Sequence, residues 1–237
     1  MSRSTQTLRS ISLFSGCGGL DLGLHSAGFR TVLATDSEPL CTETFERNFP
    51  KTPFLTGRIG RFSRQDFVDA MGGKVGDIDL IAGGPPCPPF SKSRFYRQDM
   101  PRALEDPNGW ETVDGFLKTL EWFRPRTFLM ENVKGLAYNV HRDALDTIIS
   151  RAEGVGYKVT WGVLNAADFG VPQIRERCFV MGSLDGALTL PSPTHSKEPL
   201  EDLKPWVPAG AVLADLDTEE AADDRGHYAG GQHNDLL

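Results

Sequence analysis

Apolar positions along residues 8–182 follow two patterns, as short continuous runs and as stretches with helical spacing. Continuous runs rich in β-branched residues are typical of buried strands, whereas apolar residues recurring every three or four positions are typical of helices. The pattern predicts strands at 8–14, 31–36, 78–84, within 124–133, at 158–164 and at 177–182. It predicts helices at 20–29, 38–49, 113–123 and 141–157. Strands that alternate with helices indicate an α/β fold, a mainly parallel sheet with helices on both faces.

The pattern changes at about Gly186. Residues 186–237 are punctuated by proline, rich in acid and glycine, and without clear periodicity. The net charge of −7 lies entirely there, because ten acids stand against three bases after residue 186 while residues 1–185 are balanced. The acidic total therefore does not exclude a nucleic-acid partner for the rest of the chain. We expect a folded core over 1–185 and an acidic, Pro/Gly-rich linker over 186–237.

Composition excludes several classes of protein. A hydrophobic content of 39% and a charged content of 24% are typical of a globular chain rather than a disordered one. No apolar run approaches the ~18 residues of a membrane-spanning helix, and the N-terminus lacks the apolar core of a signal peptide. The four cysteines, Cys17, Cys41, Cys87 and Cys178, show no CxxC spacing, so we expect neither a metal site nor a disulfide scaffold. These features predict a cytoplasmic protein with reduced thiols and no membrane partner.

A glycine-rich turn follows the first predicted strand and consists of Phe14, Ser15, Gly16, Cys17, Gly18 and Gly19. Glycines at a strand end let the backbone approach a nucleotide-like ligand closely, next to the N-terminus of a helix. Asp36 ends the second strand, where a carboxylate can accept hydrogen bonds from ribose hydroxyls. The turn alone is equally consistent with a tight connection that binds nothing. Together with the strand order and Asp36, it predicts a site for a nucleoside cofactor.

The segment GGPPCPPFS (83–91) places prolines on both sides of Cys87, at the carboxyl end of a buried strand. Open α/β sheets carry their sites at this edge. A single cysteine is more often a small core residue, and that is our interpretation of Cys17, Cys41 and Cys178. The rigid loop favours Cys87 as a presented nucleophile, whose reactivity requires an activated thiolate.

Two further groups of polar residues lie at strand ends. Glu131 ends an apolar strand, either as a surface cap or in the same crevice as Cys87, where burial would raise its pKa and let it donate a proton. Gln173, Arg175 and Arg177 recur with period two, which places them on one face of an extended segment. That face is either a solvated edge or a pair of guanidinium groups that grips a carbonyl or a phosphate.

With these motifs in this order, the sequence resembles the cytosine-C5 DNA methyltransferase family. The matching segments are FSGCGGLDLG, GGPPCPPFS, ENVKGL and QIRERCFVMG, spread from about Ile11 to Gly182. The resemblance implies a Rossmann-like methyltransferase fold, S-adenosylmethionine as the cofactor and duplex DNA as the substrate. It assigns cofactor roles to Phe14, to the turn at 15–19 and to Asp36.

The resemblance also implies a reaction, in which a cytosine is flipped out of the duplex and methylated at C5. Cys87 attacks C6 covalently, Glu131 hydrogen-bonds and protonates N3, and C5 then takes the methyl group. Loss of the C5 proton and expulsion of Cys87 complete the cycle. Arg177, with Arg175 in support, would hold the base O2 and the loop. This chemistry requires no metal.

The sequence departs from the family at four positions. Pro88 and Pro89 follow Cys87 where the family usually has Gln and a small residue, which stiffens the loop. Ser37 replaces an aromatic residue that stacks on adenine, and Arg58 replaces an acid that contacts the adenine amino group. We therefore expect weakened contacts to the cofactor.

The largest departure concerns the region that follows the core. Family members continue with a target-recognition domain and a closing motif that completes the cofactor pocket, and residues 186–237 resemble neither. We expect the N-terminal catalytic portion of an enzyme, either half of a split enzyme that acts with a second polypeptide or a truncated form. Two alternatives remain for its activity: the tRNA-directed branch of the family, which shares these motifs, and a protein that binds cofactor or DNA without turnover.

Overall fold

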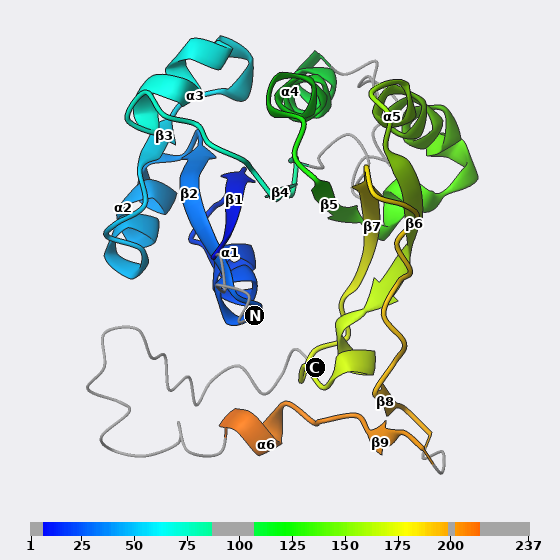
Figure 1. Cartoon of the computed structure of the whole chain (residues 1–237). Helices are drawn as coiled ribbons and strands as arrows, with labels where there is room; N and C mark the ends of the chain where they lie inside the picture. The colour runs from blue at the N-terminus through cyan, green and yellow to red at the C-terminus, as the bar shows by residue number, and fades with distance from the viewer. Residues whose placement is uncertain (1–6, 87–106, 199–201, 214–237) are drawn as a thin grey trace, which may run out of the picture. The chain divides into compact units, whose positions relative to one another are not determined.

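The computed structural model describes residues 7–86, 107–198 and 202–213 (Figure 1). The chain divides into two compact units, one formed by residues 1–163 and 177–190 and the other by 164–176 and 191–237. Cys87, the predicted nucleophile, lies outside the described residues, as does most of the acidic tail.

A seven-stranded sheet with the order β3-β2-β1-β4-β5-β7-β6 forms the centre of the fold. Its strands are β1 (Leu8–Leu13), β2 (Phe29–Asp36), β3 (Phe54–Thr56), β4 (Leu80–Gly83), β5 (Thr127–Val133), β6 (Lys158–Asn165) and β7 (Glu176–Ser183). The strand β1 pairs in parallel with β2 and β4, β2 pairs in parallel with β3, and β4 pairs in parallel with β5. Only β7 is antiparallel to its described partner, β5. The predicted mainly parallel sheet is confirmed.

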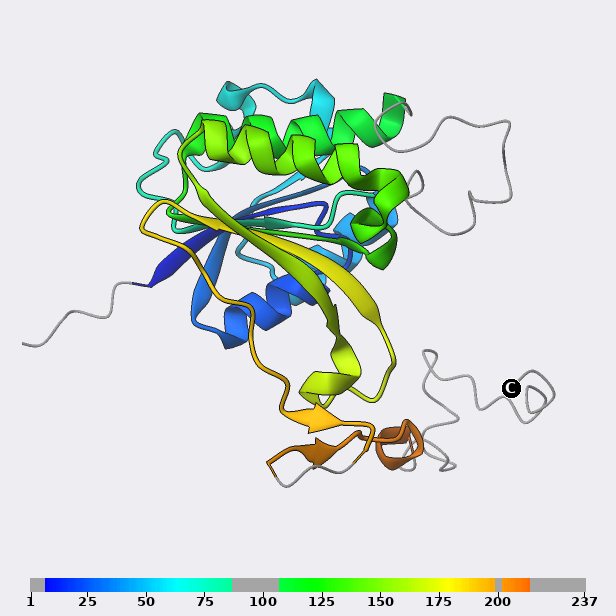
Figure 2. The ribbon, with the colours of Figure 1, turned by 90° about the vertical axis from the view of Figure 1, so that its right-hand side faces the viewer.

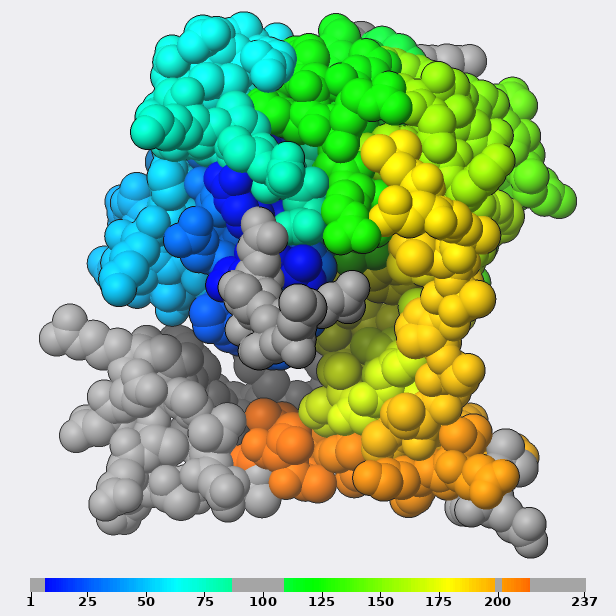
Figure 3. Space-filling model, viewed as in Figure 1, coloured from blue at the N-terminus to red at the C-terminus, as the bar shows by residue number. Residues whose placement is uncertain are grey.

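Helices cover both faces of this sheet, as predicted (Figures 1 and 2). On one face lie α3 (Arg64–Ala70), α4 (Pro107–Phe123) and α5 (Arg142–Gly154). The rings of Phe67 in α3 and Phe123 in α4 lie 5.7 Å apart, and the two helices meet without a gap in Figure 3. The other face is covered by α1 (Gly19–Ser26), while α2 (Pro39–Asn48) packs Phe45 against Phe54 of β3.

The main core lies between the sheet and the face formed by α3, α4 and α5. It is built from apolar side chains that the structure buries almost completely, among them Ile11, Leu13, Ile81, Phe116, Leu120, Phe128, Met130, Leu145 and Val180. The α1 side holds a smaller apolar cluster of Leu24, Leu80 and Ala82. All four residues of β4 are buried, as expected for a central strand covered on both faces.

The second unit contains short elements: a 3₁₀ turn η7 (Ala166–Phe169), β8 (His195–Ser196), β9 (Lys204–Pro205) and α6 (Gly210–Leu213). The strands β8 and β9 pair in parallel, and the indole N–H of Trp206 donates to Asp168 Oδ1 at 2.9 Å. Sequence periodicity indicates none of β8, β9 and α6. Within the described ranges, no helix combines the length and the apolar character needed to span a bilayer.

Candidate functional site

The turn after β1 is held in a conformation that explains its glycines. Gly16 and Gly18 have φ values of +54° and +89°, the left-handed region that glycine enters without steric cost, and Phe14 has φ +55°. The N–H of Ser15 donates to the carbonyl of Thr35 at 2.9 Å, and the N–H of Gly18 donates to the carbonyl of Ser15 at 2.9 Å. The turn is therefore fastened to the end of β2.

Asp36 ends β2, and its carboxylate is fixed by two backbone donors. Oδ2 accepts from the N–H of Gly16 and Oδ1 accepts from the N–H of Glu38, both at 2.9 Å. The structure thus brings together the glycine-rich turn and the acid that sequence analysis assigns to one site. Each carboxylate oxygen keeps a further lone pair for a ligand hydroxyl.

The space beside this turn suits the expected cofactor, S-adenosylmethionine. A Cβ atom placed on Gly16 or on Gly19 would meet no heavy atom within 4 Å. The first N–H groups of α1, which begins at Gly19, have no partner within the helix and attract a carboxylate. The Asp36 carboxylate, which sequence analysis assigns to ribose hydroxyls, lies beside the same turn. The turn therefore offers backbone donors, open space and a carboxylate in one place.

Gly18 is the glycine of this turn with the least room. A Cβ atom there would lie 2.5 Å from Phe49 Cε2, whereas Gly19 has open space around it and no positive φ. We expect Gly18→Ala to lower the free energy of unfolding by about 1–3 kcal/mol through strain and overlap. The matched Gly19→Ala should change it by less than about 1 kcal/mol. Urea denaturation followed by circular dichroism measures both, and equal losses would contradict the assignment.

Arg58, which stands where the family usually has an acid, pairs with the carboxylate of Glu111. Its Nε donates to Glu111 Oε1 at 3.1 Å, and a terminal nitrogen donates to the other oxygen of the same carboxylate. These hydrogen bonds lower the pKa of Glu111 and raise that of Arg58. Glu111 belongs to α4, and sequence analysis did not indicate it because the pair spans 53 residues.

The carboxyl ends of β4 and β5 meet next to the predicted catalytic segment. A Cβ atom on Gly84 would lie 3.0 Å from Glu131 Oε2, so the Glu131 carboxylate lies close to the backbone at the end of β4. The side chain of Asn132 is buried, and its Nδ2 donates to the carbonyl of Pro85 at 3.1 Å. Cys87 follows Pro85 by two residues. Sequence analysis quoted Asn132 in a motif without assigning it this contact.

Asn132 therefore holds the backbone where the predicted catalytic segment begins. We expect Asn132→Ala to lower the free energy of unfolding by about 1–3 kcal/mol, because the buried carbonyl of Pro85 loses its donor. Asn139, an exposed asparagine nearby in sequence, is the matched control. Its replacement by alanine should change stability by no more than about 0.5 kcal/mol. Chemical denaturation of both variants tests the difference, and a loss of equal size in the control would refute the role of the contact.

Glu131 and Arg177 form an ion pair between β5 and β7. Arg177 Nε lies 2.9 Å from Glu131 Oε1, and the side chains are 23% and 28% exposed. The antiparallel register places Val133 opposite Arg177, so the arginine reaches back along the edge toward Glu131. Both side chains are accessible enough to touch a ligand and buried enough to be oriented. This pair was predicted only as two separate polar groups.

Cys178 is the neighbour of Arg177 and lies on the opposite face of β7. It is fully buried, and burial together with the charge of Glu131 raises the pKa of its thiol to about 11. The interpretation of Cys178 as a core residue is confirmed. Cys17, by contrast, is exposed and Cys41 is half-buried, so the same interpretation is wrong for Cys17.

The predicted extended face formed by Gln173, Arg175 and Arg177 is only partly correct. The strand begins at Glu176, and the N–H of Gln173 donates to the carbonyl of Val171 in a turn. Arg175 belongs to the second unit, where its N–H donates to Asn165 Oδ1 at 3.0 Å and its side chain is exposed. Regular alternation therefore fails at Gln173 because a turn, rather than a strand, contains it.

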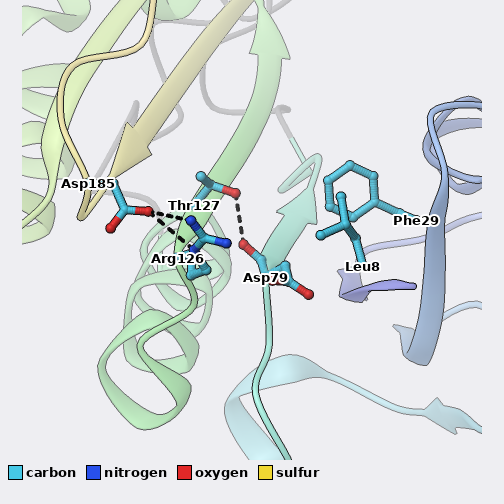
Figure 4. A pocket seen from close by; sticks show the side chains of 6 residues that line it. All are labelled: Leu8, Phe29, Asp79, Arg126, Thr127 and Asp185. Atoms are coloured by element: carbon cyan, nitrogen blue, oxygen red, sulfur yellow. Dashed lines mark hydrogen bonds and ion pairs between the residues drawn. The ribbon is translucent and has the colours of Figure 1, made fainter. Parts of the chain in front are cut away.

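A separate cavity of about 140 Å³ lies at the amino ends of the strands (Figure 4). Leu8 and Phe29 form its apolar side, and the ion pair of Arg126 with Asp185, at 2.8 Å, forms the other. Thr127 donates to the carbonyl of Asp79 at 2.8 Å on the same wall. The motifs described above lie at the carboxyl ends, the opposite edge of the sheet, so this cavity is not part of the candidate site.

Comparisons with known proteins identify relatives of the chain. The family model described as C-5 cytosine-specific DNA methylase matches residues 8–235. The type II methyltransferase M.SacI of Streptomyces achromogenes is 40% identical over 205 residues, 81% of this chain and 52% of that relative. The type II methyltransferase M.AquIA of Picosynechococcus sp. is 41% identical over 194 residues, 78% of this chain and 76% of that relative.

A solved structure also matches the fold. It is a DNA modification methyltransferase encoded within a prophage of E. coli, with a TM-score of 0.63 and 28% identity, and the match covers 74% of this chain and 46% of that one. The Rossmann-like methyltransferase fold is thereby confirmed. The chain spans about half the length of most of the curated relatives that it matches. M.AquIA, of which the match covers 76%, is much closer to it in length.

Proposed function

Because this chain belongs to the C-5 cytosine-specific DNA methylase family, we propose that it is the catalytic part of an enzyme that methylates C5 of cytosine in duplex DNA. The observation that carries the proposal is the Glu131–Arg177 pair beside Gly84, at the strand ends that lead to Cys87. S-adenosylmethionine, the cofactor of this family, supplies the methyl group. The relatives reported above are bacterial proteins, and we place the proposed reaction in the cytoplasm, where the DNA of a bacterial cell lies.

The proposed site gives each polar residue a separate task. The Cys87 thiolate attacks C6 of a flipped-out cytosine, and C5 then takes the methyl group. The thiolate is expelled when the C5 proton passes to water and the N3 proton returns to Glu131. Glu131 donates a hydrogen bond and a proton to N3, and Arg177 orients Glu131 while binding the base O2. For Arg175 we keep the supporting role that the resemblance to the family implies. Such positioned proton transfer is worth about 10²–10⁴-fold in rate.

We assign the binding of S-adenosylmethionine to the glycine-rich turn after β1 and to Asp36. Asp36 accepts from ribose hydroxyls, and Phe14, Ser15, Gly16 and the residues Cys17, Gly18 and Gly19 form the turn against which the cofactor lies. Ser37 is exposed and offers no aromatic surface, so affinity is expected to be weak. Arg58 is paired with Glu111 and does not replace the missing acid.

We further propose that residues 1–185 act as the catalytic core, that 186–237 lead toward the recognition region, and that a second polypeptide supplies this region. The face of β5 and β7 on the α1 side carries partly exposed apolar side chains, on which a partner could pack. Leu129, Phe179 and Met181 there remain half-buried, whereas Met130 and Val180 on the opposite face are buried. A partner that packs on this face would also complete the cofactor pocket.

Transfer of labelled methyl from S-adenosylmethionine tests the function directly. The purified chain is assayed on unmethylated duplex DNA and on bulk tRNA, alone and with the polypeptide encoded beside it. Label on DNA only in the presence of the second polypeptide supports the whole proposal. Label on DNA with the chain alone removes the need for a partner, and label on tRNA alone favours the tRNA-directed activity. Cofactor binding without transfer to either substrate under any condition would overturn the catalytic proposal.

A further inference from the structure

The interface between α1 and the sheet contains an ionisable group that the proposed reaction does not use. Asp21 lies in the first turn of α1 and is 0% exposed. Burial raises the pKa of its carboxyl, while hydrogen bonds from Thr31 and Ser12 act in the opposite direction. A buried carboxylate is unfavourable unless it is well hydrogen-bonded. The residues that donate hydrogen bonds to the Asp21 carboxylate therefore indicate its role.

Two chains of hydrogen bonds meet at the Asp21 carboxylate, and we call them its two arms. On one side, Ser12 Oγ donates to Asp21 Oδ2 at 2.8 Å, and Ser15 Oγ in turn donates to Ser12 Oγ at 2.8 Å. On the other side, Thr31 Oγ1 donates to Asp21 Oδ1 at 2.8 Å and meets Ser10 Oγ at 3.4 Å. Only the first arm ends in the glycine-rich turn, because the second stays within β1 and β2.

The carboxylate fixes the direction of the hydroxyl protons in the first arm. A carboxylate only accepts hydrogen bonds, so Ser12 must use its single proton on Asp21. Ser15 must then donate to Ser12, and the Ser12 carbonyl, 3.2 Å from Ser15 Oγ, is the other acceptor within its reach. While it donates to Ser12, the Ser15 hydroxyl meets a ligand as an acceptor.

We propose that Asp21 is a positioning residue for the cofactor, acting through Ser12 on Ser15. The arm holds the Ser15 side chain, while the Ser15 N–H and carbonyl hold the backbone of the turn on Thr35 and Gly18. A hydroxyl fixed as an acceptor suits a donor group, and S-adenosylmethionine carries both an ammonium group and ribose hydroxyls. The inference rests on the proposed cofactor role of the turn.

The two arms provide a matched pair of variants. Ser12→Ala and Thr31→Val each remove one hydroxyl donor from the same carboxylate, but only Ser12→Ala breaks the connection to Ser15. We measure amide hydrogen exchange of the peptide that spans residues 14–19 in the full chain, and the dissociation constant of S-adenosylmethionine by calorimetry. Ser12→Ala should speed exchange in this peptide and weaken cofactor binding by about five- to tenfold, the scale of one lost hydrogen bond. Thr31→Val should leave both within about twofold of the parent chain.

Asp21→Asn tests the carboxylate itself. Alone it should weaken cofactor binding, and in the Ser12→Ala background it should add nothing, because both changes interrupt one arm. Equal effects of Ser12→Ala and Thr31→Val on peptide 14–19, or additive effects of Asp21→Asn and Ser12→Ala, would reduce Asp21 to an anchor of α1 and overturn the inference. Failure of the proposed function has a different signature. The parent chain would then show no protection of this peptide by S-adenosylmethionine, while exchange without cofactor still compares the two arms.

Discussion

Replacement of Cys87 by alanine is expected to abolish methyl transfer, with a loss of at least about 10⁴-fold, because the proposed reaction needs the Cys87 thiolate to form the bond to C6. Cys87 follows Pro85 by two residues in the sequence, and the Pro85 carbonyl is held by Asn132. Methyl transfer to duplex DNA, measured with the second polypeptide present, gives the rate. Cofactor binding should stay unchanged, since Cys87 has no role in it.

The other thiols provide the control for this variant. Cys41 lies half-buried on α2, and Cys41→Ala should retain activity within about threefold, as for a substitution outside the reacting groups. Duplex DNA that contains 5-fluorocytosine adds a second measurement, because fluorine at C5 cannot leave as a proton and the covalent adduct persists. A denaturing gel should show the adduct for the parent chain and for Cys41→Ala only. An adduct formed by Cys87→Ala would place the nucleophile elsewhere.

Much of the sheet could be predicted from the sequence because its central strands are continuous apolar runs. The runs at 8–14, 31–36 and 78–84 became β1, β2 and β4, and their carboxyl ends carry the predicted motifs. Besides β8, β9 and α6, the strand β3 and the helix α3 were missed. The strand β3 has three residues and one parallel partner, so it leaves no periodic pattern. The helix α3 has a capping box of Ser63 and Asp66, a local signal that would have indicated its start.

The site could be predicted only to the level of single residues. Glu131 is recognisable because an acid ends an apolar strand, but its pairing with Arg177 depends on the antiparallel register of β5 and β7, which brings together residues 46 positions apart in the chain. The same limit applies to Asp21 and Ser12, whose spacing suggests no contact until α1 folds back on β1. The antiparallel pairing of β5 with β7 and the packing of α1 on β1 create these contacts, and neither is encoded in a local pattern.

Replacement of Glu131 by glutamine is expected to lower kcat by about 10²–10⁴-fold while changing cofactor binding little. Glutamine keeps the shape of the side chain but cannot hold or move a proton at N3, and it gives up the charge that binds Arg177 Nε at 2.9 Å. Because the loss concerns proton transfer rather than affinity, KM for DNA should change much less than kcat. Single-turnover methyl transfer with the second polypeptide present separates the two quantities.

Glu153→Gln is the matched control, since Glu153 is an exposed glutamate on α5. It should retain the parent rate, so that a fall specific to Glu131→Gln reports on the site and not on net charge. Arg177→Lys adds a second test of the pair, because lysine keeps the charge but lacks the planar guanidinium that orients the carboxylate. We expect it to lower kcat in the same direction as Glu131→Gln, and the double variant should be little worse than Glu131→Gln alone. Full activity of Glu131→Gln would remove Glu131 from the reaction and leave its pair with Arg177 a structural contact between β5 and β7.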